Sequence, residues 1–369
     1  MKRILIFHPA LAPYRVDFFN ELGKLVELRV VFMTRNNANQ AFDQRELLKD
    51  STYSIGYLDR HYKIAKRNVN LGYRHEIDEF KPDVVICNEY GVSLWSCFVH
   101  RFTNHAKYKI FTICDDSEDV FRQRRGIRKY VSRYFVKKID GIICINPQVA
   151  EGYRNIGARK VSLFPIIYKD SLYKNKIAKA TGITNHYIDK YHLAGKKCIL
   201  FVGRFAPVKN LTKLLESFAR LSSSNAEELR LILVGDGEQR DKLLNLAFEL
   251  GIDKNVLFPG RFEGNELLAW YNLDGVFILP STYEPFGAVV SEALMAGMPV
   301  IASERVGAKC LINSDNGIIC SSEDINDIYE KTRGMLNRVK PIETITTVRE
   351  SLLTYNFDNL MESLVQDLA

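Results

Sequence analysis

Two carboxylates flank the predicted start of a helix within residues 278–302, which have the sequence ILPSTYEPFGAVVSEALMAGMPVIA. Glu284 comes directly before the tripeptide PFG, where we expect the helix to open. Glu292 lies five residues beyond Gly287, roughly 7–8 Å further along the helix axis. Unpaired N–H groups at a helix start can bind an anion, and carboxylates beside them can accept hydrogen bonds from sugar or ribose hydroxyls. The segment therefore predicts a phosphate site flanked by hydroxyl-binding groups. Taken singly, each glutamate could instead be an ordinary helix residue.

Basic side chains and glycines follow the other strands of the same half. Gly203, Arg204 and Lys209 stand in GRFAPVKN, directly after an apolar strand. An Arg fork and a Lys ammonium beside a helix start would suit a diphosphate. Gly235 in GDGEQRDKL permits close backbone approach to a ligand, although such a turn is also ordinary between a strand and a helix. Arg261 follows the next strand, at the same edge of the predicted sheet.

The first half offers weaker candidates on position alone. His8, Tyr14 and Arg15 follow the first strand, in HPALAPYR, and Asp115 begins the acidic run DDSED after another strand. They are candidates for binding an acceptor, although the sequence favours a structural role over a functional one for each. The run DDSED is more typical of a charged helix N-terminus than of a metal site.

Residues 121–138, FRQRRGIRKYVSRYFVKK, are strongly basic and contain no acidic residue. Tyr130, Val131, Tyr134 and Phe135 would form an apolar edge on the same helix. Such a helix suits an anionic membrane surface or a lipid-diphosphate acceptor. A solvated helix with a buried aromatic stripe explains the pattern equally well. Nucleic-acid binding is disfavoured, because the rest of the chain contains no recognisable nucleic-acid-binding module.

Alternating strands and helices must position these groups. Apolar strands are predicted at 3–8, 28–33, 83–88, 108–114, 141–146 and 161–165, and then at 198–202, 230–234, 255–259, 275–279, 299–302 and 317–320. Helices at 210–222, 238–250, 264–271, 286–296 and 323–335 fill the second series. The pattern predicts an α/β protein of two doubly wound, Rossmann-like domains. Ligands of such sheets bind at the carboxyl ends of the strands, so we expect a central cleft between the domains.

The predicted boundaries follow from where the alternation weakens. The first domain covers 1–170, the polar, lysine-rich stretch 171–196 is the expected linker, and the second domain covers 197–352. An amphipathic helix closes the chain at 353–369. Residues 34–66 show few periodic signals and are expected to be an irregular connection.

The composition is that of a globular protein, with 46% hydrophobic and 26% charged residues and a formal net charge of +7. The seven cysteines are scattered and form no CxxC pair, so we expect reduced, buried thiols and a cytoplasmic location. The chain opens directly on a strand, which argues against a signal peptide. No run of residues is long and apolar enough for a membrane span.

In order and spacing, the motifs GRFAPVKN, VGDGE, FPGR and PSTYEPFGAVVSEALMAGMPVIAS resemble the second half of the retaining glycosyltransferases of family 4. The E-x7-E motif of that family appears as Glu284 and Glu292. The resemblance covers about residues 198–320 and implies a two-domain GT-B fold that uses a nucleotide-sugar donor. It also implies that the closing helix crosses back to the first domain.

The resemblance also implies roles for individual residues. Arg204 and Lys209 match the clamp on the donor diphosphate, which stabilises charge on the leaving group. Glu284 matches the carboxylate that holds donor-sugar hydroxyls, beside the amides of Phe286, Gly287 and Ala288. Glu292 matches the ribose ligand. Arg261 is a candidate for the nucleobase edge. Because the clamp is basic, we expect no metal requirement, and UDP or GDP is the expected nucleotide.

The first half departs from the pattern of the family. HPALAPYR replaces the usual glycine-rich loop, and Asp115 and Asp116 stand where many relatives carry a His. The sequence thus predicts a retaining glycosyltransferase acting on a hydroxyl of a glycan or lipid-linked glycan, at the cytoplasmic face of the membrane. A sugar-nucleotide isomerase of similar shape and a catalytically silent sugar-nucleotide binder are the alternatives.

Overall fold

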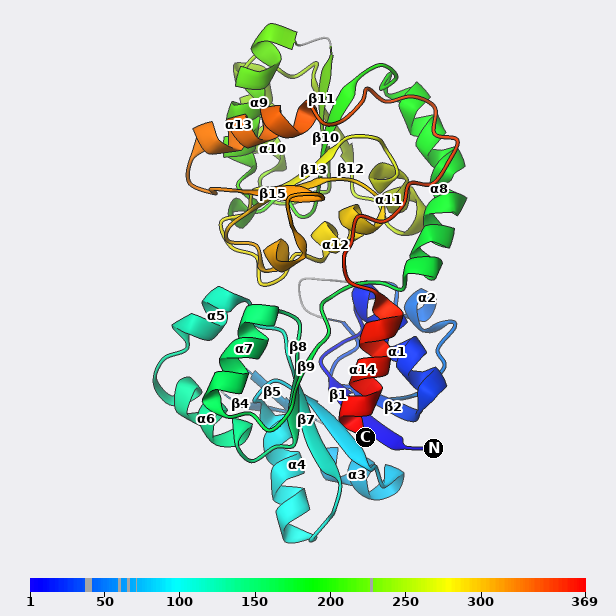
Figure 1. Ribbon diagram of the computed structural model, residues 1–369, viewed down its shortest axis with the longest axis vertical. Helices are drawn as coiled ribbons and strands as arrows, with labels where there is room; N and C mark the ends of the chain where they lie inside the picture. The colour runs from blue at the N-terminus through cyan, green and yellow to red at the C-terminus, as the bar shows by residue number, and fades with distance from the viewer. Residues whose placement is uncertain (37–41, 59–60, 65–66, 71, 226–227) are drawn as a thin grey trace. The chain divides into compact units, whose positions relative to one another are not determined.

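The computed structural model describes residues 1–36, 42–58, 61–64, 67–70, 72–225 and 228–369, and the chain divides into two compact units (Figure 1). The first unit comprises Met1–Ile166 and Phe357–Ala369, and the second comprises Ile167–Asn356. Each unit holds one parallel sheet with helices on both faces. The prediction of two doubly wound, Rossmann-like domains is therefore confirmed.

The sheet of the first unit has the strand order β3-β2-β1-β6-β7-β8-β9, and every neighbouring pair is parallel. Its strands are β1 (Arg3–His8), β2 (Glu27–Phe32), β3 (Ser54–Tyr57), β6 (Val84–Asn88), β7 (Lys109–Cys114), β8 (Gly141–Cys144) and β9 (Val161–Leu163). The chain order reverses at β1, between β2 and β6. Open α/β sheets bind ligands at the carboxyl ends of the strands at such a point.

Helices cover both faces of this sheet. The helices of the first unit are α1 (Pro13–Leu25), α2 (Gln44–Leu48), α3 (Tyr73–Phe80), α4 (Val92–Thr103), α5 (Glu118–Gln123), α6 (Gly126–Val136), α7 (Pro147–Ile156) and α14 (Phe357–Leu368). Side chains of α3, α4, α6 and α7 share one apolar core with the strands. On the other face, α14 lies against α1 and β9. The rings of Phe18 and Phe357 both pack edge-on against Phe164, so the last helix belongs to the first unit.

The second sheet has the strand order β12-β11-β10-β13-β14-β15, again parallel throughout. Its strands are β10 (Lys197–Val202), β11 (Leu229–Val234), β12 (Val256–Gly260), β13 (Val276–Leu279), β14 (Val300–Ser303) and β15 (Gly317–Cys320). Helices α9 (Leu211–Asn225), α10 (Arg240–Glu249) and α13 (Ile325–Leu336) pack together, and so do α8 (Asp170–Lys190), α11 (Gly264–Tyr271) and α12 (Ala288–Met295). The first loop after β10 contains the short helix η1 (Pro207–Lys209) and η2 (Gly307–Leu311) follows β14.

The expected linker at 171–196 is wrong for most of its length. Those residues lie within helix α8 and the turn that follows it, and all of them belong to the second unit. The buried face of α8 consists of Tyr173, Ile177, Ala180, Thr184, Tyr187 and Ile188. Their spacing is helical, but tyrosines, an alanine and a threonine replace the aliphatic side chains that would mark a buried helix in a sequence.

The connection at 34–66 is less irregular than predicted. Asp43 caps α2, accepting hydrogen bonds from the amides of Arg45 and Glu46, and β3 extends the sheet. The strands β4 (His61–Ile64) and β5 (Arg67–Asn70) form an antiparallel pair. The predictions for residues 37–41, 59–60 and 65–66 lie outside the described residues.

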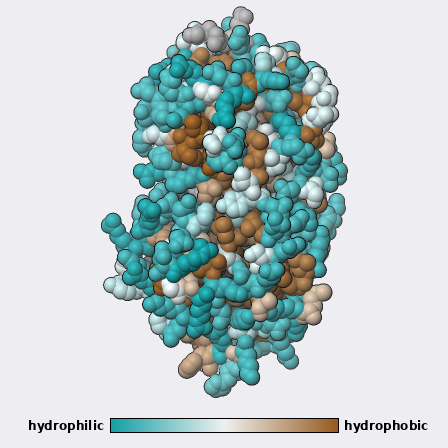
Figure 2. Space-filling model, viewed as in Figure 1, coloured by the Kyte–Doolittle hydropathy of each residue, from teal (hydrophilic) through white to brown (hydrophobic). Residues whose placement is uncertain are grey.

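Polar side chains dominate the face shown in Figure 2, where hydrophobic side chains gather only in limited patches. Six of the seven cysteines are buried, and Cys310 is partly buried. Among the described residues, no helix is both long and apolar enough to cross a membrane.

Candidate functional site

The loops after β10 and β13 are bonded to each other, because these strands are neighbours in the second sheet. The amide of Thr282 donates to the carbonyl oxygen of Val208 at 2.8 Å. The side-chain amide of Asn210 donates to the carbonyl oxygen of Pro280 at 3.1 Å. These contacts place η1 and the turn that carries Glu284 side by side at the carboxyl edge of the sheet.

Lys209 and Glu284 form an ion pair between these two loops. The Lys209 side chain is 16% exposed and that of Glu284 is 17% exposed, so the pair is shielded but still reachable from solvent. The sequence predicted that both residues act on one donor but did not predict their direct contact. The pairing keeps an otherwise unbalanced ammonium and carboxylate stable at a partly dry site.

The backbone of Glu284 is fixed by the segment after β14. The amide of Glu284 donates to the carbonyl oxygen of Arg305 at 3.2 Å, and the amide of Gly307 donates to the carbonyl oxygen of Glu284 at 3.0 Å. Glu284 and Val306 thereby form an isolated parallel bridge. The carboxylate consequently projects from a braced backbone.

Helix α12 begins two residues later than predicted. Gly287 precedes its first turn with φ +90°, a conformation that side chains disfavour, so PFG forms a turn and not the opening of the helix. A Cβ atom at Gly287 would lie 3.1 Å from Cγ of Glu284. The amides of Phe286, Gly287 and Ala288 donate to no acceptor among the described residues. Three free donors thus adjoin the Lys209–Glu284 pair, as an anion site requires.

The loop after β10 passes very close to the loop after β11. A Cβ atom at Gly235 would lie 1.9 Å from the carbonyl oxygen of Gly203, which explains the glycine at this position. Arg204 is exposed and forms no ion pair with the described residues, so its guanidinium is available. Arg261 follows β12 and pairs with Glu263, and both side chains are more than half exposed.

Glu292 is held by three tyrosines. Tyr168 donates to Oε1 at 2.5 Å, Tyr271 donates to Oε2 at 2.7 Å, and Tyr173 donates to the backbone carbonyl oxygen at 2.9 Å. Burial raises the pKa of Glu292, while the hydrogen bonds from Tyr168 and Tyr271 oppose that shift. An ordinary solvent-facing helix residue would not be enclosed in this way. Nothing in the sequence indicated these tyrosines, because they come from distant segments.

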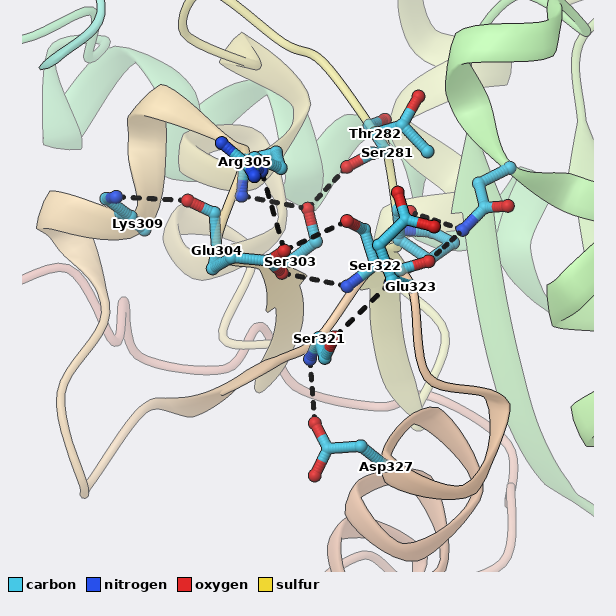
Figure 3. Close-up of polar contacts among 12 residues, drawn as sticks. Ser281, Thr282, Ser303, Glu304, Arg305, Lys309, Ser321, Ser322, Glu323 and Asp327 are labelled. Carbon is cyan, nitrogen blue, oxygen red and sulfur yellow. Dashed lines mark hydrogen bonds and ion pairs between the residues drawn. The ribbon is translucent and has the colours of Figure 1, made fainter. Parts of the chain in front are cut away.

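Serines at the carboxyl ends of β13, β14 and β15 build a polar network that sequence reasoning missed (Figure 3). Ser303 Oγ donates to the carbonyl oxygen of Ser281 at 2.5 Å. The Glu304 carboxylate accepts from the amide of Ser322 at 2.8 Å and from its hydroxyl at 3.0 Å. Asn210 also donates to the carbonyl oxygen of Ser322, at 2.8 Å. The network ties together the loops that carry Lys209 and Glu284, and the serine after each strand was its signal in the sequence.

In the first unit, Arg15 and Asp115 meet above the carboxyl edge of the sheet. Arg15 is 2% exposed, and its Nη2 donates to Oδ1 of Asp115 at 2.6 Å. His8 is buried and its Nδ1 lies 3.0 Å from the carbonyl oxygen of Ala10. Burial, together with the nearby Arg15 charge, lowers the pKa of His8 to about 4, so the ring is neutral near pH 7. Tyr14 is partly buried, which raises its pKa.

A second buried ion pair in this unit was also missed. Arg124 pairs with Asp116 and donates to the Tyr153 hydroxyl at 2.7 Å. The rest of DDSED begins α5, where Ser117 caps the helix and Glu118 and Asp119 occupy its first turn. Arg124 therefore does not belong to the exposed basic face predicted over 121–138.

The chain is similar to known proteins over part of its length. Residues 186–342 match the family model of glycosyl transferases group 1. An uncharacterized glycosyltransferase of Methanocaldococcus jannaschii is 38% identical over 125 residues, which are 33% of this chain and 31% of that protein. The lipopolysaccharide core biosynthesis glycosyltransferase LpsE of Rhizobium meliloti is 26% identical over 236 residues, 62% of this chain and 61% of that protein. The matches thus span less than two thirds of these relatives.

Solved structures extend the likeness to both units as a fold. The Anabaena protein HepE in complex with UDP aligns with a TM-score of 0.72 and 15% identity, covering 100% of this chain and 99% of that one. The lipopolysaccharide outer core galactosyltransferase WaaB aligns with a TM-score of 0.63 and 20% identity, covering 99% and 100%. The family model matches most of the second unit, and the solved structures share the two-unit fold of this chain.

Proposed function

We propose that the protein is a retaining glycosyltransferase of family 4 that transfers a sugar from a nucleoside-diphosphate sugar to a hydroxyl group. The observation that carries the proposal is the Lys209–Glu284 pair beside the free amides at the start of α12. A cation, a carboxylate and backbone donors within one braced turn can hold a phosphate and the sugar attached to it. The E-x7-E motif, Glu284 and Glu292, belongs to this proposal.

In the proposed complex, the donor diphosphate binds Arg204, Lys209 and the amides of residues 286–288. These groups stabilise the negative charge that grows on the nucleoside diphosphate as the glycosidic bond breaks. Because cations and amides already neutralise this charge, transfer needs no metal. UDP or GDP is the proposed nucleotide, and Arg261 and Gly235 lie on loops near its base and phosphates. The likeness to a fold solved with UDP favours UDP.

The two glutamates take different groups of the donor. Glu284 accepts hydrogen bonds from donor-sugar hydroxyls and Glu292 accepts them from the ribose. Each oxygen of Glu292 already accepts one tyrosine hydrogen bond, and a carboxylate oxygen has room for a second. Tyr168, Tyr173 and Tyr271 thus hold Glu292 in place for binding the ribose.

We assign the second unit to the donor and the first unit to the acceptor, with His8, Tyr14, Arg15 and Asp115 as acceptor-side candidates. In the proposed front-face reaction, the bond between the sugar C1 and the diphosphate oxygen breaks. The acceptor oxygen forms a new bond to C1 on the same face, and its proton passes to the leaving phosphate. The configuration at C1 is therefore retained.

The proposed acceptor is a glycan or a lipid-linked glycan at the cytoplasmic face of a membrane. The similarity to a lipopolysaccharide core glycosyltransferase favours an acceptor of this kind. The basic segment 121–138 is the proposed contact with the anionic surface.

The proposal is tested with UDP-, GDP-, ADP- and TDP-sugars, first by thermal shift and then by release of the nucleoside diphosphate with added glycan acceptors. We expect Glu284→Ala and Lys209→Ala each to lower turnover by about 100-fold or more. The exposed pair Lys174–Glu350 of the same unit supplies the controls, Lys174→Ala and Glu350→Ala. Those controls should keep normal turnover.

Other results would point elsewhere. Near-normal turnover by either site variant contradicts the site assignment. Rearrangement of the nucleotide sugar without an acceptor supports an isomerase, and binding without turnover supports a silent binder. Inversion at C1, detected by NMR of the product, contradicts retention.

A further inference from the structure

Large hydrophobic side chains are exposed on α4 and α6 of the first unit. Of the 13 most exposed ones among the described residues, six lie on these two helices. We call them the α4–α6 surface, which comprises Val92, Trp95, Phe102, Ile127, Tyr130 and Tyr134. Contiguous apolar exposure of this kind marks an interaction site more often than isolated exposed side chains do.

Helical spacing explains why these side chains point outward together. Ile127, Tyr130 and Tyr134 follow the i, i+3, i+7 pattern of one helix face and are 82%, 75% and 53% exposed. The opposite face of α6 carries Phe135 and Val136, which are buried in the core of the unit. The aromatic stripe expected at 121–138 is therefore divided, with only part of it in the core.

The exposed side chains of the two helices meet around one buried ring. The Phe135 ring lies 5.4 Å from Trp95 and 5.5 Å from Phe98 of α4, and 5.6 Å from Tyr134 of its own helix. Trp95 is 55% exposed. The apolar side chains of α4 and α6 consequently form one surface and not two separate ones.

A row of cations runs beside this surface. Lys129, Arg133 and Lys137 are four residues apart, so they share one side of α6 and its C-terminus, and all three are exposed. Arg125 and Lys138 are exposed too, and none of the five forms an ion pair with the described residues. By contrast, Arg122 pairs with Glu118 at 2.5 Å. The side chain of Arg128 lies outside the described set.

An open groove of about 470 Å³ lies at the end of α4. It is lined by Phe98, Arg101, Phe102, His105, Ala106 and Lys138. Arg101 is already bound to Asp140 at 2.6 Å, which leaves the Lys138 ammonium as the available charge. Phe102 is 79% exposed at its rim. An aromatic rim with a cation inside suits a phosphate head group whose acyl chains lie outside the groove.

We propose that the α4–α6 surface binds an anionic phospholipid bilayer, with the groove taking a lipid phosphate. The apolar and aromatic side chains enter the interfacial layer, and the cation row lies at the depth of the phosphates. Because both rows run along one helix, α6 can bind flat with each row at its preferred depth. This inference extends the membrane contact proposed for 121–138 to α4 and the groove, and it requires no catalytic activity.

The test is cosedimentation of the full chain with two kinds of vesicle. One contains phosphatidylcholine alone, and the other contains phosphatidylcholine with about 30 mol% phosphatidylglycerol. We expect binding to the mixed vesicles that weakens as salt is raised, because exposed charges are screened. The triple variant Lys129→Gln, Arg133→Gln, Lys137→Gln should lose about 100-fold in partition coefficient, since each cation contributes roughly five-fold. High salt should leave the binding that comes from the apolar side chains. The double variant Ile127→Ser, Tyr130→Ser should therefore lose the binding that remains at high salt.

The matched control is Lys179→Gln, Lys242→Gln, Lys254→Gln, which removes three exposed cations of the second unit. It should bind vesicles like the wild type. Unchanged UDP-induced thermal shifts would show that every variant is folded. Lys138→Gln should weaken binding to phosphatidylglycerol more than Lys129→Gln does, if the groove holds a phosphate.

Several outcomes would overturn the inference. Equal vesicle binding by the wild type and the triple variant would show that the cation row does not contribute to membrane binding. Binding to double-stranded DNA in place of vesicles indicates a nucleic-acid surface. A dimer that dissociates on Tyr130→Ser, without vesicle binding, indicates a contact between copies. Vesicle binding by a chain that transfers no sugar would still support this inference while contradicting the proposed function.

Discussion

The carboxyl edges of the two sheets are built on different principles. In the second unit, the edge holds the Lys209–Glu284 pair, but its backbone turns leave Arg204 and three amides free for a ligand. In the first unit, charged side chains turn inward and pair with one another, as Arg15 does with Asp115 and Arg124 with Asp116. The comparison indicates that an edge suited to a charged ligand keeps at least one cation and several amides without a partner, even where it also holds an ion pair. An edge whose cations are each paired with a carboxylate mainly supports the fold.

The sharpest test of this contrast exchanges one arginine in each unit for methionine. Arg15→Met leaves Asp115 without its partner, and we expect a loss of about 3–4 kcal/mol in the free energy of unfolding. Arg204→Met should change stability by less than about 0.5 kcal/mol but weaken nucleotide binding. Urea denaturation and nucleotide titration measure the two effects. If Arg204→Met were the less stable variant, the contrast would be wrong.

The buried histidine of the first unit provides a pH test. The pKa of His8 falls from 6.5 to about 4 on folding, so the unfolded chain binds more protons between these values. Stability from this group is complete above pH 6.5 and is lost as the pH falls toward 4, by about 3 kcal/mol at most. His8→Gln should flatten the stability curve in that window, measured by urea denaturation at several pH values.

A smaller effect tests the turn in the second unit. Gly287→Ala places a methyl group at φ +90° and within 3.2 Å of three side-chain atoms, so we expect a cost of about 2 kcal/mol and several-fold weaker nucleotide binding. Gly264→Ala is the matched control at φ +57°, where no atom beyond its chain neighbours and the backbone of its own helix lies within 4 Å of the new Cβ. It should cost about 1 kcal/mol and leave binding unchanged. Equal nucleotide affinities of the two variants would show that the free amides beside Gly287 do not bind the nucleotide.

The same contrast explains what the sequence could predict. The glycines, the proline and the glutamates around 278–302 are constrained by local backbone geometry, so they mark the candidate site within one short stretch. The start of α12 was misplaced because Pro285 suits a first helical turn, whereas Gly287 adopts a left-handed conformation that ends the preceding turn. Local sequence cannot distinguish these two arrangements.

Contacts between distant segments were not predictable. Lys209 meets Glu284 because the sheet order brings their loops together. Tyr168 meets Glu292 because α8, which follows Tyr168, packs against α12. In the first unit, Arg15 and Asp115 were chosen on position alone, and nothing in the sequence indicated that they pair. Helix α8 escaped prediction because tyrosine and threonine supply much of its buried face.

The return of α14 to the first unit has a consequence for biosynthesis. The second unit is inserted between Ile166 and Phe357 of the first, so the ribosome can complete the insert before it has made the last helix of the unit that began the chain. Until then, the ring of Phe164 lacks its contact with Phe357. From the synthesis of Phe164 until that of Phe357, the nascent chain therefore carries an uncovered aromatic side chain, and the docking of α14 completes the first unit.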